Sequence, residues 1–131
     1  MILAILDAIH EQFVLDDGAE VTMGMDPGTF DVKYLINVME VGVNRVSMGV
    51  QSFNNEILAS LGRVHHSIDI YRSVEIIGMA FGIDDANYSI DLMLGMPGLT
   101  LAGWAHMLSK SMVVVQHWGG SQRCHRIDDD H

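Results

Sequence analysis

Three polar side chains lie where they could bind the sugar or the charged groups of a small molecule. Asp91 interrupts the apolar run Ile90–Leu94, and a carboxylate in such surroundings costs several kcal/mol unless it is paired. It could accept from both hydroxyls of a sugar diol, or serve as a structural carboxylate bonded to Arg45 or to backbone amides. Gln51 can donate and accept, which suits ribose hydroxyls or an adenine edge, or it can cap a loop. Arg63 can fork onto a ligand carboxylate, or be a surface arginine near a helix end.

Gln51 and Asp91 belong to two of three polar or glycine-rich patches, each of which follows an apolar strand. The patches are Gly24–Thr29 (with Pro27 and Gly28), Gly49–Ser52, and Asp91 followed by Gly95–Pro97. In parallel α/β folds functional groups collect at the C-terminal ends of strands, so the patches are expected to lie close together. Glycines there let a backbone approach a ligand, although glycine turns also simply end strands. The sequence contains no GxGxxG, GxxxxGKS/T or GxSxG motif.

The histidines and the single cysteine could suggest a metal centre. Adjacent His65 and His66 point in different directions on a helix or a strand, which disfavours a shared metal. Four further ligand types lie near the C-terminal end: His117, Cys124, His125 and His131. Their spacing matches no standard zinc site, and we predict no metal ligands. A chain with one cysteine also cannot hold a 4Fe–4S cluster alone, because such a cluster normally needs three or four thiolates.

The elements that position these groups follow from hydrophobic periodicity. Helices are expected at about 2–13, 31–41, 54–61 and 67–81, with another after Thr100, and strands at 20–25, 45–50 and 86–94. Asn54, Ser67 and Thr100 are the expected N-caps of the last three helices. Strands that alternate with helices run parallel and are joined by right-handed crossovers. The sequence therefore predicts an α/β fold of about three parallel strands with covering helices.

Composition narrows the classes of partner and compartment. The chain has 131 residues, enough for one domain or part of one, and its net charge of −10 argues against nucleic acid. No apolar run approaches the roughly 18 residues of a membrane span. The N-terminal segment lacks the basic region of a signal peptide, and a lone cysteine fits a reducing compartment. We expect a cytoplasmic location for the chain as it stands.

The C-terminal segment differs from the rest of the chain. From Gln116 to His131 the sequence shows no periodicity, and it contains three consecutive aspartates. Such a composition is typical of disorder. The expected organisation is a partial domain over residues 1–115 and a divergent, disordered tail over residues 116–131.

Four stretches of the sequence resemble a known family. They are EVTMGMDPGTFD (20–31), GVNRVSMGVQSFNNEILASLGRVHH (42–66), YSIDLMLGMPGLT (88–100) and the following Trp104. They resemble the radical S-adenosylmethionine (radical SAM) proteins, in particular the oxygen-independent coproporphyrinogen III oxidase-like group that includes the haem chaperone. The resemblance runs from about Ile2 to Val115. The wording DPGTFD is closest to plant members, and the ending GRVH (62–65) favours the chaperone-like branch.

The resemblance implies a fold, a cofactor and a set of ligand residues. The fold would be a fragment of a partial TIM-like barrel, with S-adenosylmethionine (SAM) across the C-terminal strand ends. Gln51 and Asp91 would bind its ribose hydroxyls, Arg63 its carboxylate, and the turn at Pro27 and Gly28 would belong to the same site. The CxxxCxxC loop that holds the family's 4Fe–4S cluster is absent, as is the acidic residue that pairs with the SAM amino group, at the place of Gly24.

These departures shape the functional hypotheses. Radical chemistry needs a reduced cluster, so the sequence leaves open whether this chain is an enzyme. The leading hypothesis is a coproporphyrinogen III oxidase-like, porphyrin- or haem-related fragment with a residual SAM half-site, inactive alone. The alternatives are a non-catalytic module that binds haem or a partner, and a truncated product without a role. Three strands of an interrupted barrel leave open sheet edges, which favour association. A full-length plant relative would be expected in a plastid or a mitochondrion.

Overall fold

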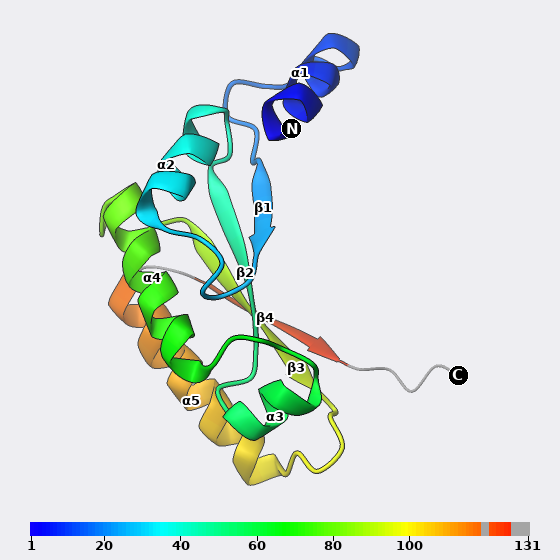
Figure 1. Ribbon diagram of the computed structural model, residues 1–131, viewed down its shortest axis with the longest axis vertical. Helices are drawn as coiled ribbons and strands as arrows, with labels where there is room; N and C mark the ends of the chain where they lie inside the picture. Colours follow the sequence, from blue (N-terminus) through cyan, green and yellow to red (C-terminus); the bar gives the residue numbers. More distant parts are fainter. Residues whose placement is uncertain (119–120, 127–131) are drawn as a thin grey trace.

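The computed structural model describes residues 1–118 and 121–126, with side chains through residue 116. The elements are α1 (Ile2–Gln12), β1 (Thr22–Met25), α2 (Val32–Glu40), β2 (Arg45–Gln51), α3 (Asn55–Ser60), α4 (Ser67–Phe81), β3 (Tyr88–Leu94), α5 (Leu101–Trp118) and β4 (Ser121–Arg126). The strands form one parallel sheet in the order β1-β2-β3-β4 (Figure 1). The predicted α/β class and its parallel strands are confirmed.

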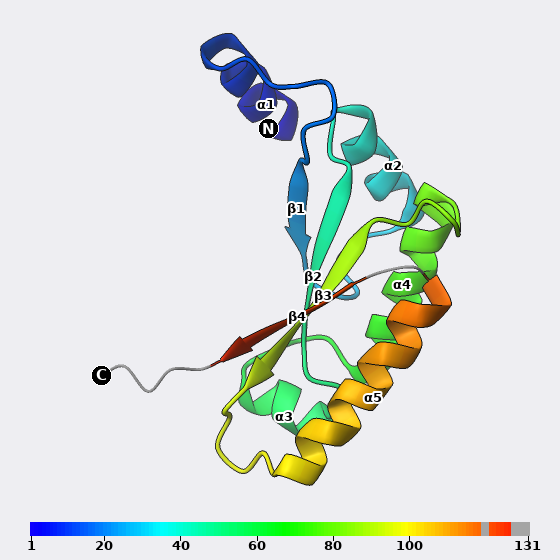
Figure 2. The ribbon, with the colours of Figure 1, turned by 180° about the vertical axis from the view of Figure 1, so that it is seen from behind.

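Helices α2, α4 and α5 lie on one side of this sheet, and the short helix α3 lies at the end toward which the strands point (Figures 1 and 2). Right-handed crossovers place successive helices on the same face when the sheet grows in one direction, which is the strand order seen here. No helix of the described part of the chain lies against the opposite face. The described residues therefore form two layers, with helices on one face of the sheet and none on the other.

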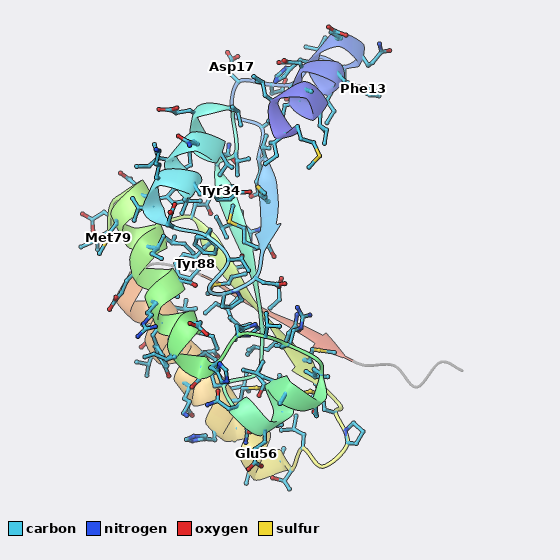
Figure 3. The ribbon with its side chains drawn as sticks, in the orientation of Figure 1. Phe13, Asp17, Tyr34, Glu56, Met79 and Tyr88 are labelled. Carbon is cyan, nitrogen blue, oxygen red and sulfur yellow. The ribbon has the colours of Figure 1, made fainter. Side chains whose placement is uncertain are left out.

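The two faces of the sheet differ because successive side chains of a strand point in opposite directions. The helix-facing side chains of β2 and β3 are at most 1% exposed: Val46, Met48, Val50, Tyr88, Ile90 and Leu92. Tyr88 lies between the sheet and the helices (Figure 3), and its hydroxyl donates to the Val114 carbonyl of α5 at 3.3 Å. The intervening residues are polar or small, and they occupy the uncovered face: Ser47, Gly49, Gln51, Ser89 and Asp91.

Most helix starts follow the predicted caps. The Asn54 side chain accepts from the amides of Glu56 and Ile57, at 2.8 and 3.2 Å, and Thr100 Oγ1 accepts from the Gly103 amide at 3.0 Å. The cap predicted at Ser67 is wrong by one residue. His66 is the N-cap of α4, because the Asp69 carboxylate accepts from its amide at 2.8 Å and fixes the first turn there.

The N-terminal helix α1 is present as predicted, but it buries none of its residues. It lies beyond the N-terminal ends of the strands, apart from the helix layer (Figure 1). Ile2 packs against the core, whereas Leu3, Ile5 and Phe13 are more than half exposed. The apolar stripe that predicts this helix is therefore only partly covered within the described structure.

The C-terminal segment carries more regular structure than the sequence suggests. Helix α5 continues to Trp118, and β4 extends the sheet beside β3, with Ser89 in register with Ser121 and Leu94 with Arg126. A strand needs only backbone partners, and the edge of β3 supplies them whatever the side-chain pattern. The placement of residues 119–120 and 127–131 lies outside the described residues, and the boundary at 115/116 stays a prediction.

Candidate functional site

The carboxyl ends of β1, β2 and β3 surround a small cavity on the uncovered face of the sheet. Its volume is about 230 Å³, and it is lined by Gly24, Met25, Asp26, Ser47, Gly49 and Asp91. Every lining residue comes from one of the three strands or, for Asp26, from the position directly after β1. The cavity therefore lies where parallel α/β folds collect their functional groups.

A second cavity, of about 450 Å³, lies between α3 and α5. Its lining includes Phe53, Glu56, His106 and Lys110. It is larger, but it contains none of the residues predicted to bind a ligand, and it lies between two helices rather than on the sheet. We place the candidate site in the smaller cavity, because polar groups from three separate strands converge there.

Asp91 reaches the cavity from β3 and is held by a neighbouring strand. Ser47 Oγ donates to Asp91 Oδ2 at 2.6 Å, and Ser89, the register partner of Ser47 on β3, lies within 3.5 Å of the Ser47 hydroxyl. The serine fixes one carboxylate oxygen, and a carboxylate offers about four acceptor positions in all. This hydrogen bond holds the Asp91 carboxylate in one orientation in the cavity. It agrees with the prediction that a carboxylate within an apolar strand has a polar partner.

Gln51 ends β2 in an unusual backbone conformation. Its φ is +65°, the only positive φ at a non-glycine residue among those described, and the register between β2 and β3 shifts between Met48 and Gln51. Its amide nitrogen lies 3.3 Å from the point where a Cβ on Gly49 would sit. The side chain therefore folds back over Gly49, which lines the cavity.

Gly49 allows two functional side chains to approach the backbone of β2. A Cβ built there would meet Asp26 Oδ1 at 2.8 Å as well as the Gln51 amide. Real Cβ atoms essentially never come that close to another atom, so a side chain at this position would displace Asp26, Gln51 or both. Glycine is used here for close approach, and its φ is not in the left-handed region.

Arg63 reaches the same edge from the loop after α3. Its Nη1 lies 3.1 Å from Asp26 Oδ1, in a charged hydrogen bond between two partly exposed side chains. Asp26 lines the cavity and Arg63 does not. The predicted ligand arginine is therefore brought to the rim of the site, where an acidic neighbour already contacts it.

The turn at Pro27 and Gly28 packs away from the cavity. Pro27 is among the fully buried side chains, and the Gly28 amide donates to Ser73 Oγ of α4 at 2.9 Å. Neither residue lines the cavity. The turn fixes the end of β1 against the helix layer, and direct contact of Pro27 or Gly28 with a ligand stays a prediction.

His65 and His66 have separate surroundings. His65 is 4% exposed, with Nε2 3.2 Å from the Val50 carbonyl oxygen. His66 is exposed and caps α4. The side chains of His117, Cys124, His125 and His131 lie outside the described residues.

Sequence reasoning did not single out Ser47, although the period-two pattern of β2 places it on the same face as Gln51.

The residues at this cavity are suited to binding SAM, but the chain lacks the cysteines that would hold the 4Fe–4S cluster of radical SAM proteins. A polar cavity with an oriented carboxylate and a neighbouring amide can receive a nucleoside. An iron–sulfur cluster of the 4Fe–4S type normally needs three or four thiolates, and these 131 residues contain one cysteine.

The sequence and the structure are similar to those of characterised proteins. A sequence profile described as the radical SAM superfamily matches residues 2–110. The heme chaperone HemW of Synechocystis sp. is 35% identical over 108 residues, which are 82% of this chain and 26% of that protein. HemW of Escherichia coli is 36% identical over 97 residues, 74% of this chain and 25% of that protein.

A eukaryotic relative and a solved structure extend the likeness. The mouse radical S-adenosyl methionine domain-containing protein 1, named mitochondrial, is 32% identical over 83% of this chain and 24% of its own. Coproporphyrinogen III oxidase HemN of Escherichia coli, a radical SAM enzyme, has a TM-score of 0.69 at 27% identity, over 85% of this chain and 25% of that one. The chain thus spans about a quarter of the length of these relatives, and its predicted fold, a fragment of a partial TIM-like barrel, is confirmed.

Among the described residues no helix is both long and apolar enough to cross a membrane.

Proposed function

Because the chain belongs to the radical SAM superfamily, in its coproporphyrinogen III oxidase-like and haem chaperone branch, we propose that the strand-end cavity is a residual half-site for SAM. The observation that carries the proposal is the convergence of Asp91, Gln51 and Asp26 with its partner Arg63 at one edge of the sheet. Asp26 and Asp91 line the cavity, Gln51 folds back over Gly49, and Arg63 contacts Asp26 from the loop after α3. The family resemblance implies a SAM-binding role for Asp91, Gln51 and Arg63.

Each side chain has a role that its position supports. The carboxylate of Asp91, fixed by Ser47 at 2.6 Å, accepts from the ribose hydroxyls, and the Gln51 amide reaches the same sugar from β2. Arg63 at the rim receives the carboxylate of the SAM amino-acid group. Pro27 and Gly28 support this site from behind by fixing the end of β1 to α4.

The proposed role is binding, not catalysis by these residues alone. In radical SAM proteins a bound reduced cluster and SAM together supply an organic radical. The described residues orient the ribose and bind its hydroxyls. None of them can supply the electron that a reduced cluster would transfer to SAM. We therefore propose a porphyrin- or haem-related protein segment that binds SAM and is inactive by itself. The similarity to the heme chaperone HemW and to coproporphyrinogen III oxidase HemN supports the link to haem and to coproporphyrinogen.

Calorimetry of the 131-residue chain with SAM tests the half-site. Asp91→Asn removes the charge that accepts from the sugar, and Gln51→Ala removes the amide. Asp91→Asn is expected to weaken SAM binding by about tenfold or more, since a hydrogen bond to a charged group contributes roughly 1.5–3 kcal/mol. Gln51→Ala should weaken it by up to about tenfold, since a hydrogen bond between neutral groups contributes roughly 0.5–1.5 kcal/mol. Asp84→Asn, in an exposed loop between α4 and β3, is the matched control and should bind like the parent chain.

Two outcomes would contradict the proposed half-site. Binding that survives in Asp91→Asn and Gln51→Ala at the parent affinity would place SAM elsewhere and refute the assignment. The absence of any heat with SAM at about millimolar concentration, where binding contributes roughly −4 kcal/mol, would show that the half-site has lost its ligand. Circular dichroism of each variant verifies that the fold is retained.

A further inference from the structure

We propose that this cavity recognises the nucleoside part of its ligand and gains little from an amino-acid group, so that it accepts adenosine thioethers without that group almost equally well. The inference rests on the proposed function and narrows its ligand class. 5′-Methylthioadenosine, which lacks the amino-acid end, should then bind almost as tightly as S-adenosylhomocysteine, which has it. The difference between the two ends of the site carries the argument.

The cation available for a ligand carboxylate is already compensated. Arg63 Nη1 lies 3.1 Å from Asp26 Oδ1, so a carboxylate that approaches this guanidinium also approaches the Asp26 carboxylate. The repulsion between the two like charges offsets the attraction of Arg63. The Asp26–Arg63 pair, taken together, carries no net charge, and a ligand carboxylate finds little net attraction there.

No side chain is available for a ligand amino group at Gly24. This residue lines the cavity, and a Cβ built on it meets no atom within 4 Å. Asp26, the acidic residue directly after β1, lines the cavity too, but it is already paired with Arg63 at 3.1 Å. The space beside Gly24 itself is open, with no carboxylate projecting from β1 into it. An ammonium group placed there would remain largely hydrated and would contribute little to affinity.

The nucleoside end of the site is built in contrast to this. Asp91 is oriented by the Ser47 hydroxyl at 2.6 Å, and Gln51 is held over Gly49 by a backbone with φ of +65°. Groups held in one geometry before binding lose less freedom when a ligand arrives. Most of the affinity should therefore come from the nucleoside, through its sugar.

The test compares two ligands that differ only at the amino-acid end. S-adenosylhomocysteine and 5′-methylthioadenosine both have a neutral sulfur, so the attraction of a sulfonium for the acidic cavity does not enter. Calorimetry of the full chain should give dissociation constants within about tenfold of each other, since one well-formed charged contact alone would give roughly that factor.

Two variants are expected to create a preference for the ligand that has the amino-acid group. Gly24→Glu supplies a carboxylate for the amino group, and Asp26→Asn frees Arg63 while it keeps the shape of the side chain. Each should raise the preference for S-adenosylhomocysteine over 5′-methylthioadenosine by about tenfold relative to the parent chain. Because Asp26→Asn adds no volume, it remains informative if Gly24→Glu does not fold.

Three results would count against this inference. A parent chain that prefers S-adenosylhomocysteine by clearly more than about tenfold overturns it, while the proposed SAM half-site stands. Variants that change both ligands equally overturn it as well. A parent chain that binds neither ligand overturns the proposed half-site itself, and the inference falls with it.

Discussion

Gln51 combines backbone strain with the side chain proposed to contact ribose. Its φ of +65° is in the left-handed region, which costs of order 1–3 kcal/mol for a residue with a side chain. β2 also loses its regular register to β3 before this residue. Strain of this kind persists only where the surrounding structure enforces it, and it often coincides with a binding site.

The strain predicts opposite effects on stability and on binding. Gln51→Gly should raise the free energy of unfolding by about 1 kcal/mol, because glycine adopts positive φ without cost. The same variant should weaken SAM binding by up to about tenfold, because the amide is lost. Urea unfolding followed by circular dichroism, together with calorimetry, measures both.

Gln51→Ala is the matched control for this residue. It keeps a Cβ in the left-handed region and removes the amide, so binding should fall without a gain in stability. A glycine variant that is less stable than the parent chain would show that the backbone at Gln51 is not strained.

Sequence could locate the ligand residues but not their partners. Asp91 stands out because it is charged within an apolar strand, and Gln51 because it follows one. Ser47, which orients Asp91, lies 44 positions away, and Asp26 is 37 positions from Arg63. These pairs depend on strand register and on the path of the loop after α3, which no local pattern determines.

At the scale of elements, the short helix α3 fixes the path of the chain after Gln51. It has six residues, too few to be stable without tertiary support and caps. Asn54 supplies a cap with two hydrogen bonds, and the adjacent Asn55 accepts from the Ser67 amide at 2.8 Å. The segment that carries Arg63 is thereby tied between α3 and α4.

Loss of this cap should destabilise the chain measurably. Asn54→Ala is expected to lower the free energy of unfolding by about 1 kcal/mol, because two amides of the first turn lose their acceptor. Urea unfolding with an unchanged slope would measure it. Asn37→Ala, at an exposed position within α2, is the control and should be neutral or slightly stabilising, because alanine favours helix. Equal effects of the two substitutions would exclude a capping role for Asn54.

The elements themselves were predictable to different degrees. The α/β alternation, the parallel strands and the caps at Asn54 and Thr100 follow from local patterns, and the structure bears them out. The exposed face of α1 and the strand β4 do not follow from such patterns. Periodicity reports that a helix has an apolar side, not what covers it, and β4 is placed by its backbone pairing with β3.

At the scale of the whole molecule, the chain is a section of barrel wall about a quarter as long as its relatives. β1 forms one edge of the described sheet, and the inner face carries the candidate site without a covering helix (Figure 2). Edge strands with free backbone groups are templates for pairing with another strand. We therefore propose that the chain associates through the open edge at β1, with a copy of itself when no other partner is present.

The amide of Thr22 offers a way to block that edge. The Arg45 amide bonds to the Val21 carbonyl at 3.2 Å, and in a parallel ladder this arrangement turns the neighbouring Thr22 amide toward the free side. Thr22→Pro should remove an outward donor while it spares the bonds to β2, since proline is tolerated on edge strands. Light scattering of the parent chain should give a mass that rises above 14.5 kDa with concentration, and Thr22→Pro should reduce this rise.

Thr22→Ala keeps the amide and should behave like the parent. A parent chain that remains at the monomer mass at every concentration would refute association through this edge, and equal association of the proline and alanine variants would place the contact elsewhere.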